Sequence, residues 1–466
     1  MPQHRPPSRN PVPPSTRLQA ADRAEVRRHG RRAARDTREV RGRRPRVDRS
    51  LPRGASAGRP RGDARAGDRG AADGRDDDSA RALLLRVAST TWDAVRARRL
   101  ARQSLLPRAD DPVGVAHETC GIHAQVQASA ELQLAARVDG ITQQDIREAL
   151  WEKRTLVKAW TLRGTLHLHP AEELPLWYAA MRAVSQAEPG EMQAWVDPHG
   201  ATHPALGRDD VDEIRSAVLD VLDGRCLLRE ELAADVVERI GSKARSRLLS
   251  GFNFFGGADL CQGTPQGNKI TLTRPDQWLA RWEEPDEQEA LREVCRRFLR
   301  TYGPVQPPDF RVWVAGRSFR PDDARALFES LGDELEEIDV EGHRSFVLAG
   351  DTEFPEPQPS VRLLPEYDVY VMGFREREHL VPDPVKEQVA QHGRGRYEGP
   401  AGVRFLAIDG VTAGLWERKK RGKRIELQVT PARRLTRVQR SHLDVEVERI
   451  GAFLGLEPVL TVSATR

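Results

Sequence analysis

The amino-acid sequence predicts a mixed α+β protein, and two patterns in it carry this prediction. Between about residues 90 and 350, amphipathic helical segments come in groups, each followed by short strand-like runs. After Gly350 the segments shorten, and apolar residues alternate with polar ones as they do in half-buried strands. The 466 residues are enough for about two to four domains of ordinary size.

Residues 1–80 differ in composition from everything that follows. They contain no Phe, Tyr, Trp, Ile or Lys, and they carry 21 Arg against 11 acidic residues. Such a segment cannot bury enough apolar surface to offset the entropy lost on ordering, so we expect disorder. Its net charge of +10 leaves −6 for the rest of a chain whose total is +4. A basic arm can bind nucleic acid through phosphate contacts, although a solvated extension or an over-extended reading frame is the simpler interpretation.

The first folded unit is predicted to cover residues 81–208. Thr142 is followed by Gln143, Gln144 and Asp145 and then by an amphipathic run, which is the pattern of a capped helix start. The predicted elements of this unit are helices at residues 79–106 (with a break near Thr90), 128–137 and 142–151, and a strand at residues 164–168.

Two further units repeat this layout, at residues 209–285 and 286–350. The first has helices at 211–222, 228–239 and 243–249 and a hairpin at 258–273, where Gly263 and Gly267 bracket a polar turn. The second has helices at 286–302, 307–313 and 321–331 and strands at 335–340 and 345–348. Three small helices followed by a β-hairpin is the layout of a winged helix-turn-helix, so we predict tandem winged-helix units. Their sequences are unrelated, and the repeat is one of layout only.

Residues 351–466 are predicted to form a β-rich C-terminal segment with a basic hairpin. Strands are expected at 361–364, 369–372, 403–408, 411–417 and 425–429, and a final amphipathic helix at 440–454. Six cations in seven residues surround Gly422, and they repel one another unless a polyanion is near. The net negative charge of the folded part argues against nucleic-acid binding, so local clustering has to compensate. The candidate DNA-binding residues are Arg418, Lys419, Lys420, Arg421, Lys423 and Arg424.

Several classes of function are disfavoured by the sequence. It contains no GxxxxGK[ST], GxSxG or HExxH motif, the strongest short signals for nucleotide hydrolysis, acyl transfer and zinc proteolysis. It has no run of about 18 apolar residues and no apolar signal-peptide core, so we expect a cytoplasmic protein without a membrane partner. No cysteine spacing suits zinc, and we expect no metal and four free thiols, at Cys120, Cys226, Cys261 and Cys295.

Residues 120–129, CGIHAQVQAS, resemble the winged-helix DNA glycosylases of the AlkZ and YcaQ kind, which carry a Gln, an apolar residue and a second polar residue here. Gln125, Val126 and Gln127 fit the AlkZ branch, whereas the sister branch has Asp in the last place. Two glutamines two positions apart are common by chance, so the resemblance depends on accompanying segments. These are LVKAWTLRGTLH at 156–167, LLPEYDVY at 363–370 and DGVTAGLW at 409–416, in the order and spacing of that family.

The resemblance implies a DNA glycosylase that excises N7-alkylguanine and bulkier alkyl adducts, with some members opening interstrand crosslinks, and that needs no metal or cofactor. We accordingly expect a monofunctional enzyme that acts on double-stranded DNA containing an alkylated purine and leaves an abasic site. We further expect a monomer associated with the nucleoid. Gln125 and Gln127 are the candidate catalytic residues under this interpretation; the alternative is that they are ordinary surface positions.

The chemistry of the glutamines agrees with this interpretation. A glutamine amide cannot serve as a general base at neutral pH, but its oxygen and NH₂ group can hold and orient a water. An N7-alkylated purine is cationic and leaves readily, so a positioned water near C1′ suffices, whereas ordinary guanine is spared. Glu366 and Asp368 could stabilise an oxocarbenium ion, but such residues more often fix a turn. The candidate active-site neighbours are His123, Arg163 and His167, beside Gly164, which permits an unusual turn.

Two other functions are compatible with the same sequence. A non-enzymatic winged-helix regulator would have the same helix groups, because a fold alone does not determine function. Specific binding to an undamaged operator would favour it. A scaffold that has lost activity and uses the Arg-rich tail as an interaction arm would instead bind lesion DNA without releasing a base.

Overall fold

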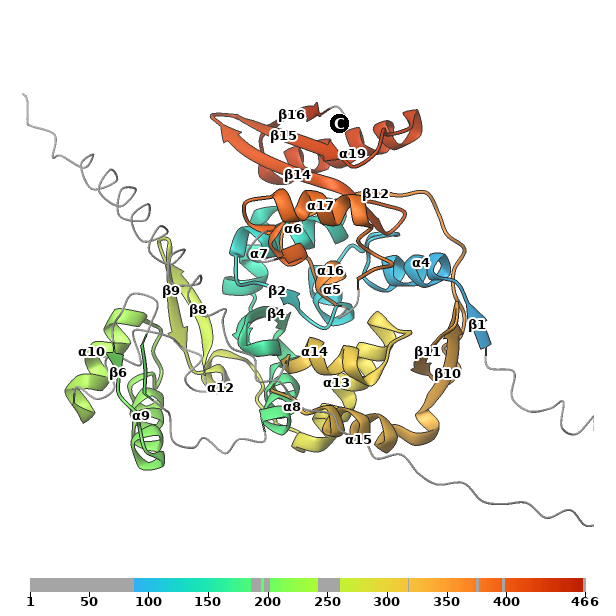
Figure 1. The fold of residues 1–466 in the computed structure, drawn as a ribbon. Coiled ribbons are helices and arrows are strands. Elements are labelled where there is room, and N and C mark those ends of the chain that lie inside the picture. The colour runs from blue at the N-terminus through green and yellow to red at the C-terminus, as the bar shows by residue number, and fades with distance from the viewer. Residues whose placement is uncertain are drawn as a thin grey trace, which may run out of the picture. The chain divides into compact units, whose positions relative to one another are not determined.

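The computed structural model describes residues 88–185, 194–196, 202–241, 260–316, 318–373, 377–395 and 399–463 (Figure 1). Over these ranges the chain is a mixed α and β structure, as predicted. Three predicted segments lie outside the described residues: the tail at 1–80, residues 79–87 of the first expected helix, and the expected helix at 243–249. Within the described part, no helix is long and apolar enough to cross a membrane.

The first helix begins later than the sequence predicts. Residues 88–90 form a strand rather than helix, and the Thr91 side chain accepts a hydrogen bond from the Ala94 amide, which caps a new helix start. The expected capping box at Thr142 is present, with Asp145 as its partner. The elements are β1 (Ala88–Thr90), α4 (Trp92–Arg102), α5 (Pro112–Glu118), β2 (Ile122–His123), α6 (Gln127–Arg137), α7 (Gln143–Arg147) and the π-helical turn η1 (Glu148–Glu152).

Strand β2 and five later strands form a six-stranded sheet with the order β2-β4-β3-β8-β9-β7. The expected strand at 164–168 begins at Leu166, because Leu162–Gly164 form a 3₁₀ turn in which Arg163 has a φ of 56°. Gly263 lies inside β8 and not in the hairpin turn, and a Cβ there would lie 2.7 Å from Cys226 Sγ. The elements are β3 (Leu156–Trp160), β4 (Leu166–Pro170), α8 (Leu174–Ser185), β5 (Trp195–Val196), β6 (Thr202–His203), α9 (Arg208–Val221), β7 (Leu227–Leu228), α10 (Arg229–Ile240), β8 (Cys261–Gln266), β9 (Lys269–Thr273) and α12 (Pro275–Trp278).

The third group of helices packs around aromatic side chains. Phe298 and Tyr302 of α13 stack on each other and both contact Trp313 of α14. A three-stranded sheet follows, in which β1 pairs in parallel with β10, so the first described strand joins a hairpin nearly 250 residues away. The elements are α13 (Glu287–Tyr302), α14 (Pro307–Ala315), α15 (Pro321–Leu331), β10 (Leu335–Val340) and β11 (His343–Leu348). The tandem winged-helix assignment itself stays a prediction.

The C-terminal segment is built on a five-stranded sheet with the order β12-β13-β14-β15-β16 (Figure 1). The prediction of a strand at 369–372 is wrong: these residues form a helical turn, because the Asp368 side chain accepts a hydrogen bond from the Tyr370 amide and caps it. Strand β16, which runs parallel to β15, was not expected. The elements are β12 (Val361–Leu364), α16 (Val369–Met372), α17 (Asp383–Gln391), β13 (Phe405–Ile408), β14 (Val411–Arg421), β15 (Arg424–Pro431), α19 (Arg437–Leu454) and β16 (Glu457–Val462).

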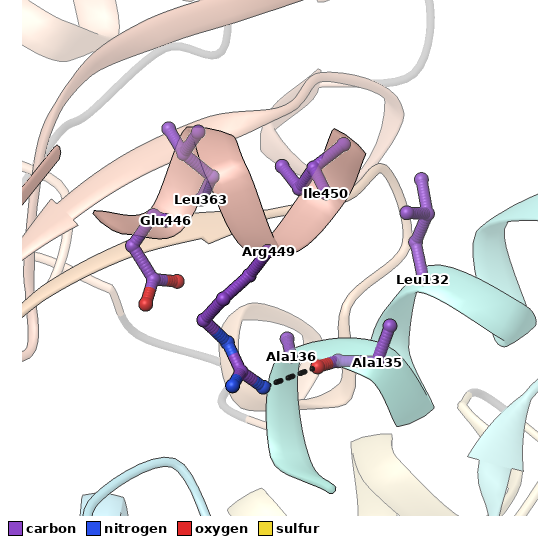
Figure 2. A pocket seen from close by; sticks show the side chains of 7 residues that line it. All are labelled: Leu132, Ala135, Ala136, Leu363, Glu446, Arg449 and Ile450. Carbon is purple, nitrogen blue, oxygen red and sulfur yellow. Dashed lines mark hydrogen bonds between the residues drawn. The ribbon is translucent and has the colours of Figure 1, made fainter. Parts of the chain in front are cut away.

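Helix α6 is anchored at its C-terminal end by helix α19. Figure 2 shows the Arg449 side chain reaching from α19 to the Ala135 carbonyl of α6. The hydrogen bond to Ala135 measures 3.2 Å, and Arg449 also donates to the Val138 carbonyl. These carbonyls belong to the end of a helix, which favours a cation. The cavity beside them measures about 20 Å³, room for one water, so this contact is tight packing and not a ligand site.

Candidate active site

The two glutamines lie where strand β2 turns into helix α6. The strand is fixed by pairing with β4, where His123 stands opposite His167, and by a 2.7 Å hydrogen bond from the Ala124 amide to the Leu166 carbonyl. Gln127 is the first residue of α6. The chain between the two elements therefore presents Gln125 at the surface, while Gln127 is half-buried.

Each glutamine side chain is held by a different part of the sheet. Gln125 Oε1 accepts a 3.3 Å hydrogen bond from the Leu166 amide, so Gln125 lies at the start of β4. Gln127 Oε1 accepts a 2.8 Å hydrogen bond from Lys158 Nζ on β3, and Gln127 Nε2 donates to Glu131 Oε1 at 3.2 Å. The exposed Nε2 group of Gln125 has no partner within the described ranges and can donate to a substrate or a water.

Three histidines lie behind the glutamines, and all three are neutral at pH 7. The rings of His123 and His167 are 5.3 Å apart, and those of His167 and His169 are 5.9 Å apart. Burial, followed by the charges of Arg163 and Lys158, lowers the pKa of His123 to about 4. Burial also lowers the pKa of His169 to about 3 and that of His167 well below its ordinary value. At pH 7 these three side chains are therefore polar but uncharged.

The Leu-Pro-Glu-Tyr-Asp stretch closes the other side of this region. Ser129 of α6 donates a hydrogen bond to the Glu366 carbonyl, and the Tyr367 ring lies 5.3 Å from the His123 ring. Tyr367 has a φ of 60°, a conformation that is uncommon for a residue with a side chain. The Glu366 carboxylate receives two hydrogen bonds from Arg404, at 2.6 and 2.8 Å. Burial alone would raise the pKa of Glu366, but the hydrogen bonds and charge of Arg404 outweigh it and lower the pKa.

Arg163 makes its hydrogen bond with the third group of helices, although its charge also acts on His123 and His167. Its guanidinium donates to the Trp313 carbonyl of α14, and burial lowers its pKa to about 10. Arg163 therefore ties the turn between β3 and β4 to the third group of helices. Of the candidate neighbours, His123 and His167 lie close to Gln125, and Arg163 hydrogen-bonds Trp313 while its charge reaches both histidines.

The basic hairpin is formed by β14 and β15, with Arg421 opposite Arg424 and Gly422 in the turn at a φ of 59°. Lys419, Lys420 and Lys423 are exposed, as are both arginines of the turn, which have acidic neighbours in Glu426 and Glu457. Arg418 differs from the others because it is half-buried. Burial and the Arg404 charge lower its pKa, and the carboxylates of Glu366 and Glu131 act in the opposite direction. Arg418, at the base of the hairpin, is thus within electrostatic reach of Glu366 and of Glu131, and Glu131 contacts Gln127.

Two residues of this site were missed by the sequence reasoning, although the sequence carries a signal for each. Lys158 is the single charge in the otherwise apolar run Leu-Val-Lys-Ala-Trp. Glu131 follows Gln127 by four positions, which puts both side chains on one helix face. The four cysteines are free, as expected, and the described part of the chain holds no group of three or more His, Cys, Asp or Glu residues suited to a metal ion.

Comparison with known proteins gives consistent matches. Residues 115–453 match the family model described as DNA glycosylase AlkZ-like. The chain is 32% identical over 357 residues to the interstrand DNA cross-link repair glycosylase of Streptomyces sahachiroi, covering 73% of this chain and 90% of that protein. The solved structure of the Streptomyces sahachiroi DNA glycosylase AlkZ superposes with a TM-score of 0.64 at 28% identity, covering 80% of this chain and all of that one.

Proposed function

Because the chain belongs to the AlkZ-like DNA glycosylase family, we propose that it is a monofunctional DNA glycosylase that removes N7-alkylated purines, including bulky or crosslinked ones, from double-stranded DNA. The observation that carries the proposal is the pair Gln125 and Gln127, held at the start of α6 by separate hydrogen bonds. Two oriented amides beside neutral histidines offer polar contacts for a water, but no strong base.

Such a site suits a leaving group that is already activated. In the proposed step, the oxygen of a water held by the two amides bonds to C1′ of the nucleotide while the C1′–N9 bond breaks. The bonding electron pair leaves with the purine, whose positive charge is thereby neutralised, and the water gives its extra proton to solvent. Because the substrate supplies the activation, orientation of the water is the main contribution asked of the protein.

The neutrality of the histidines supports the same choice of substrate. A protonated His123 or His167 would repel both the cationic purine and the developing oxocarbenium ion. Their lowered pKa values keep both histidines uncharged, so they repel neither the cationic purine nor the oxocarbenium ion. A neutral purine needs protonation before it can leave, and these histidines hold no proton to give at pH 7.

We further propose that the hairpin of β14 and β15 grips the duplex. Lys419, Lys420 and Lys423 are exposed at its end, and the half-buried Arg418 connects its base to the carboxylates around the glutamines. Phosphate contacts of this kind supply sequence-independent affinity, which a repair enzyme needs because lesions occur in any sequence. Because its substrate is chromosomal DNA, we propose that the protein is associated with the nucleoid in the cytoplasm, and we propose separately that it acts as a monomer.

The experiment that tests this function is base release under single-turnover conditions. Three duplexes of one sequence are compared: one with a single N7-methylguanine, one with an N7–N7 interstrand crosslink and one unmodified. The proposal expects release from one or both alkylated duplexes, none from the unmodified one, and an abasic site without strand cleavage. Tight binding to an unmodified sequence with no release from either lesion would favour a regulator instead.

A further inference from the structure

The amide of Gln127 is contacted at both ends by buried side chains that carry charge. Lys158 Nζ donates to its oxygen, and Glu131 Oε1 accepts from its nitrogen. An ammonium group can only donate hydrogen bonds, and an ionised carboxylate can only accept them. One orientation of the amide satisfies both contacts. The reversed orientation places NH₂ against ammonium and the carbonyl against carboxylate.

The two charged side chains are themselves held in place. Glu131 also accepts a 2.8 Å hydrogen bond from Gln143 on α7, and its exposed fraction is 7%. Lys158 is 4% exposed, in a strand whose five residues are all buried. Helix α6, helix α7 and strand β3 thus each contribute one member of the network around Gln127.

The burial of Lys158 is unfavourable by itself. A lysine in an apolar strand carries the cost of removing its charge from water, and an aliphatic residue would fill the same position without that cost. The burial lowers the pKa of Lys158 to about 8, with the Glu131 charge acting in the opposite direction. The contact with Gln127 gives this buried charge a polar partner.

We propose that Lys158 and Glu131 form a clamp that fixes the amide orientation of Gln127, so that the second lone pair of its oxygen and its second N–H always face the hydrolytic water. This inference rests on the proposed function, in which Gln127 holds that water. Lys158 and Glu131 are positioning residues, since they act through Gln127. The clamp makes the two glutamines unequal: Gln127 is locked, whereas the exposed Gln125 can adapt to the substrate.

The clamp predicts a dependence on pH in the alkaline range. The groups that face Lys158 are Glu131 on α6 and the neutral His123 on β2, and the Glu131 charge also acts on Arg418 of β14. A protonated Lys158 only donates, but a neutral amine both donates and accepts. Above this pKa only Glu131 still enforces the orientation of Gln127, so the amide is held less strictly and the excision rate falls as the pH rises through about 8.

The test uses the full chain and the N7-methylguanine duplex, with protein in excess so that DNA affinity does not limit the rate. Lys158→Met and Glu131→Gln are compared with Lys158→Arg, which keeps a charged donor at any pH. Lys153→Met is the matched control, because Lys153 is an exposed lysine five positions away whose partner is Glu148.

The clamp predicts a rate about 10²-fold lower in Lys158→Met, the cost typical of misplacing a reacting group by about 1 Å, with unchanged DNA affinity. Lys158→Arg recovers most of the rate and lacks the fall above pH 8, and Lys153→Met behaves as wild type. A full rate in Lys158→Met contradicts the clamp. So does a loss of DNA affinity with a reduced salt dependence, which would make Lys158 a phosphate contact.

A second readout separates the clamp from the proposed function. The Gln127 side-chain NH₂ signal in the NMR spectrum of the DNA-free protein, assigned by its disappearance in Gln127→Ala, reports on the amide without any substrate. The clamp predicts that this signal titrates with a midpoint near 8 in the wild type, is pH-independent in Lys158→Arg and moves in Lys158→Met. An unmoved signal in Lys158→Met overturns the clamp even if excision is observed; a titrating signal without excision overturns only the proposed function.

Discussion

Arg137, the last residue of helix α6, and Asp368 form a bidentate ion pair whose two side chains are both fully buried. The two N–O distances are 2.7 and 2.9 Å. Arg137 Nη1 also donates to the Gln133 carbonyl, and Gln133 in turn donates to the His123 carbonyl and accepts from the Val369 amide. This network connects the helix that starts at Gln127 to the stretch that carries Tyr367.

The buried pair leads to a prediction about stability. Removal of one partner leaves an uncompensated buried charge, so Arg137→Met should lower the free energy of unfolding by about 3–5 kcal/mol. Urea unfolding monitored by tryptophan fluorescence measures this. The control is Arg325→Met, which removes an exposed pair with Asp322 and should cost less than about 1 kcal/mol. Equal effects of the two changes would show that the buried pair is not a main support of α6.

The histidines predict a loss of stability in mild acid. His123, with a pKa of about 4, and His169, with a pKa of about 3, stay largely unprotonated in the folded protein between about pH 6.5 and 5, whereas histidines of the unfolded chain bind protons in this range. Because the unfolded state binds more protons in this window, stability falls as the pH falls through it. The free energy of unfolding, measured at pH 7.5, 6.0 and 5.0, gives its slope against pH. His123→Leu should reduce this slope by the amount that corresponds to about one bound proton. A stability independent of pH in this range would mean that the histidines are solvated.

The hairpin predicts how DNA affinity depends on salt. Changing Lys419, Lys420 and Lys423 together to Gln should weaken binding to any duplex and reduce the slope of log K against log salt by about 0.9 for each phosphate that the variant no longer neutralises. Fluorescence anisotropy between low and physiological salt gives the slope. The control is the exposed pair Arg320 and Arg325 on and beside helix α15, changed to Gln. If the salt slope changes only in this control variant, the DNA interface does not include the hairpin.

Much of the fold was predictable because its signals are local. Helices α6, α13 and α15 begin within one residue of the expected positions, and strand β12 coincides with its prediction. The segment Val369–Met372 was mispredicted because its β-branched and aromatic residues favour a strand locally. Its helical turn depends on Asp368, which is fixed by Arg137 from 231 positions away. Periodicity carries no information about such a contact.

The candidate site was predictable in part for the same reason. The glutamine pair came from a short segment and its family resemblance, and the structure places its neighbours His123 and His167 beside it. The contact of Lys158 with Gln127 joins residues 31 positions apart, through the pairing of β3 with β4 and of β4 with β2. A sequence shows that a lysine interrupts an apolar strand, but not which side chain it meets.

The central claim is that Gln125 and Gln127 hold the water that releases an N7-alkylated purine. It is tested most directly by single-turnover release of 7-methylguanine from a duplex with one lesion, comparing the wild type with a variant carrying both Gln125→Ala and Gln127→Ala, each at saturating protein. We predict release by the wild type and a rate at least about 10²-fold lower in the double variant, with circular dichroism and DNA affinity unchanged. Release at the wild-type rate by the double variant, or no release by the wild type from this lesion or a bulkier N7 adduct, would contradict the account.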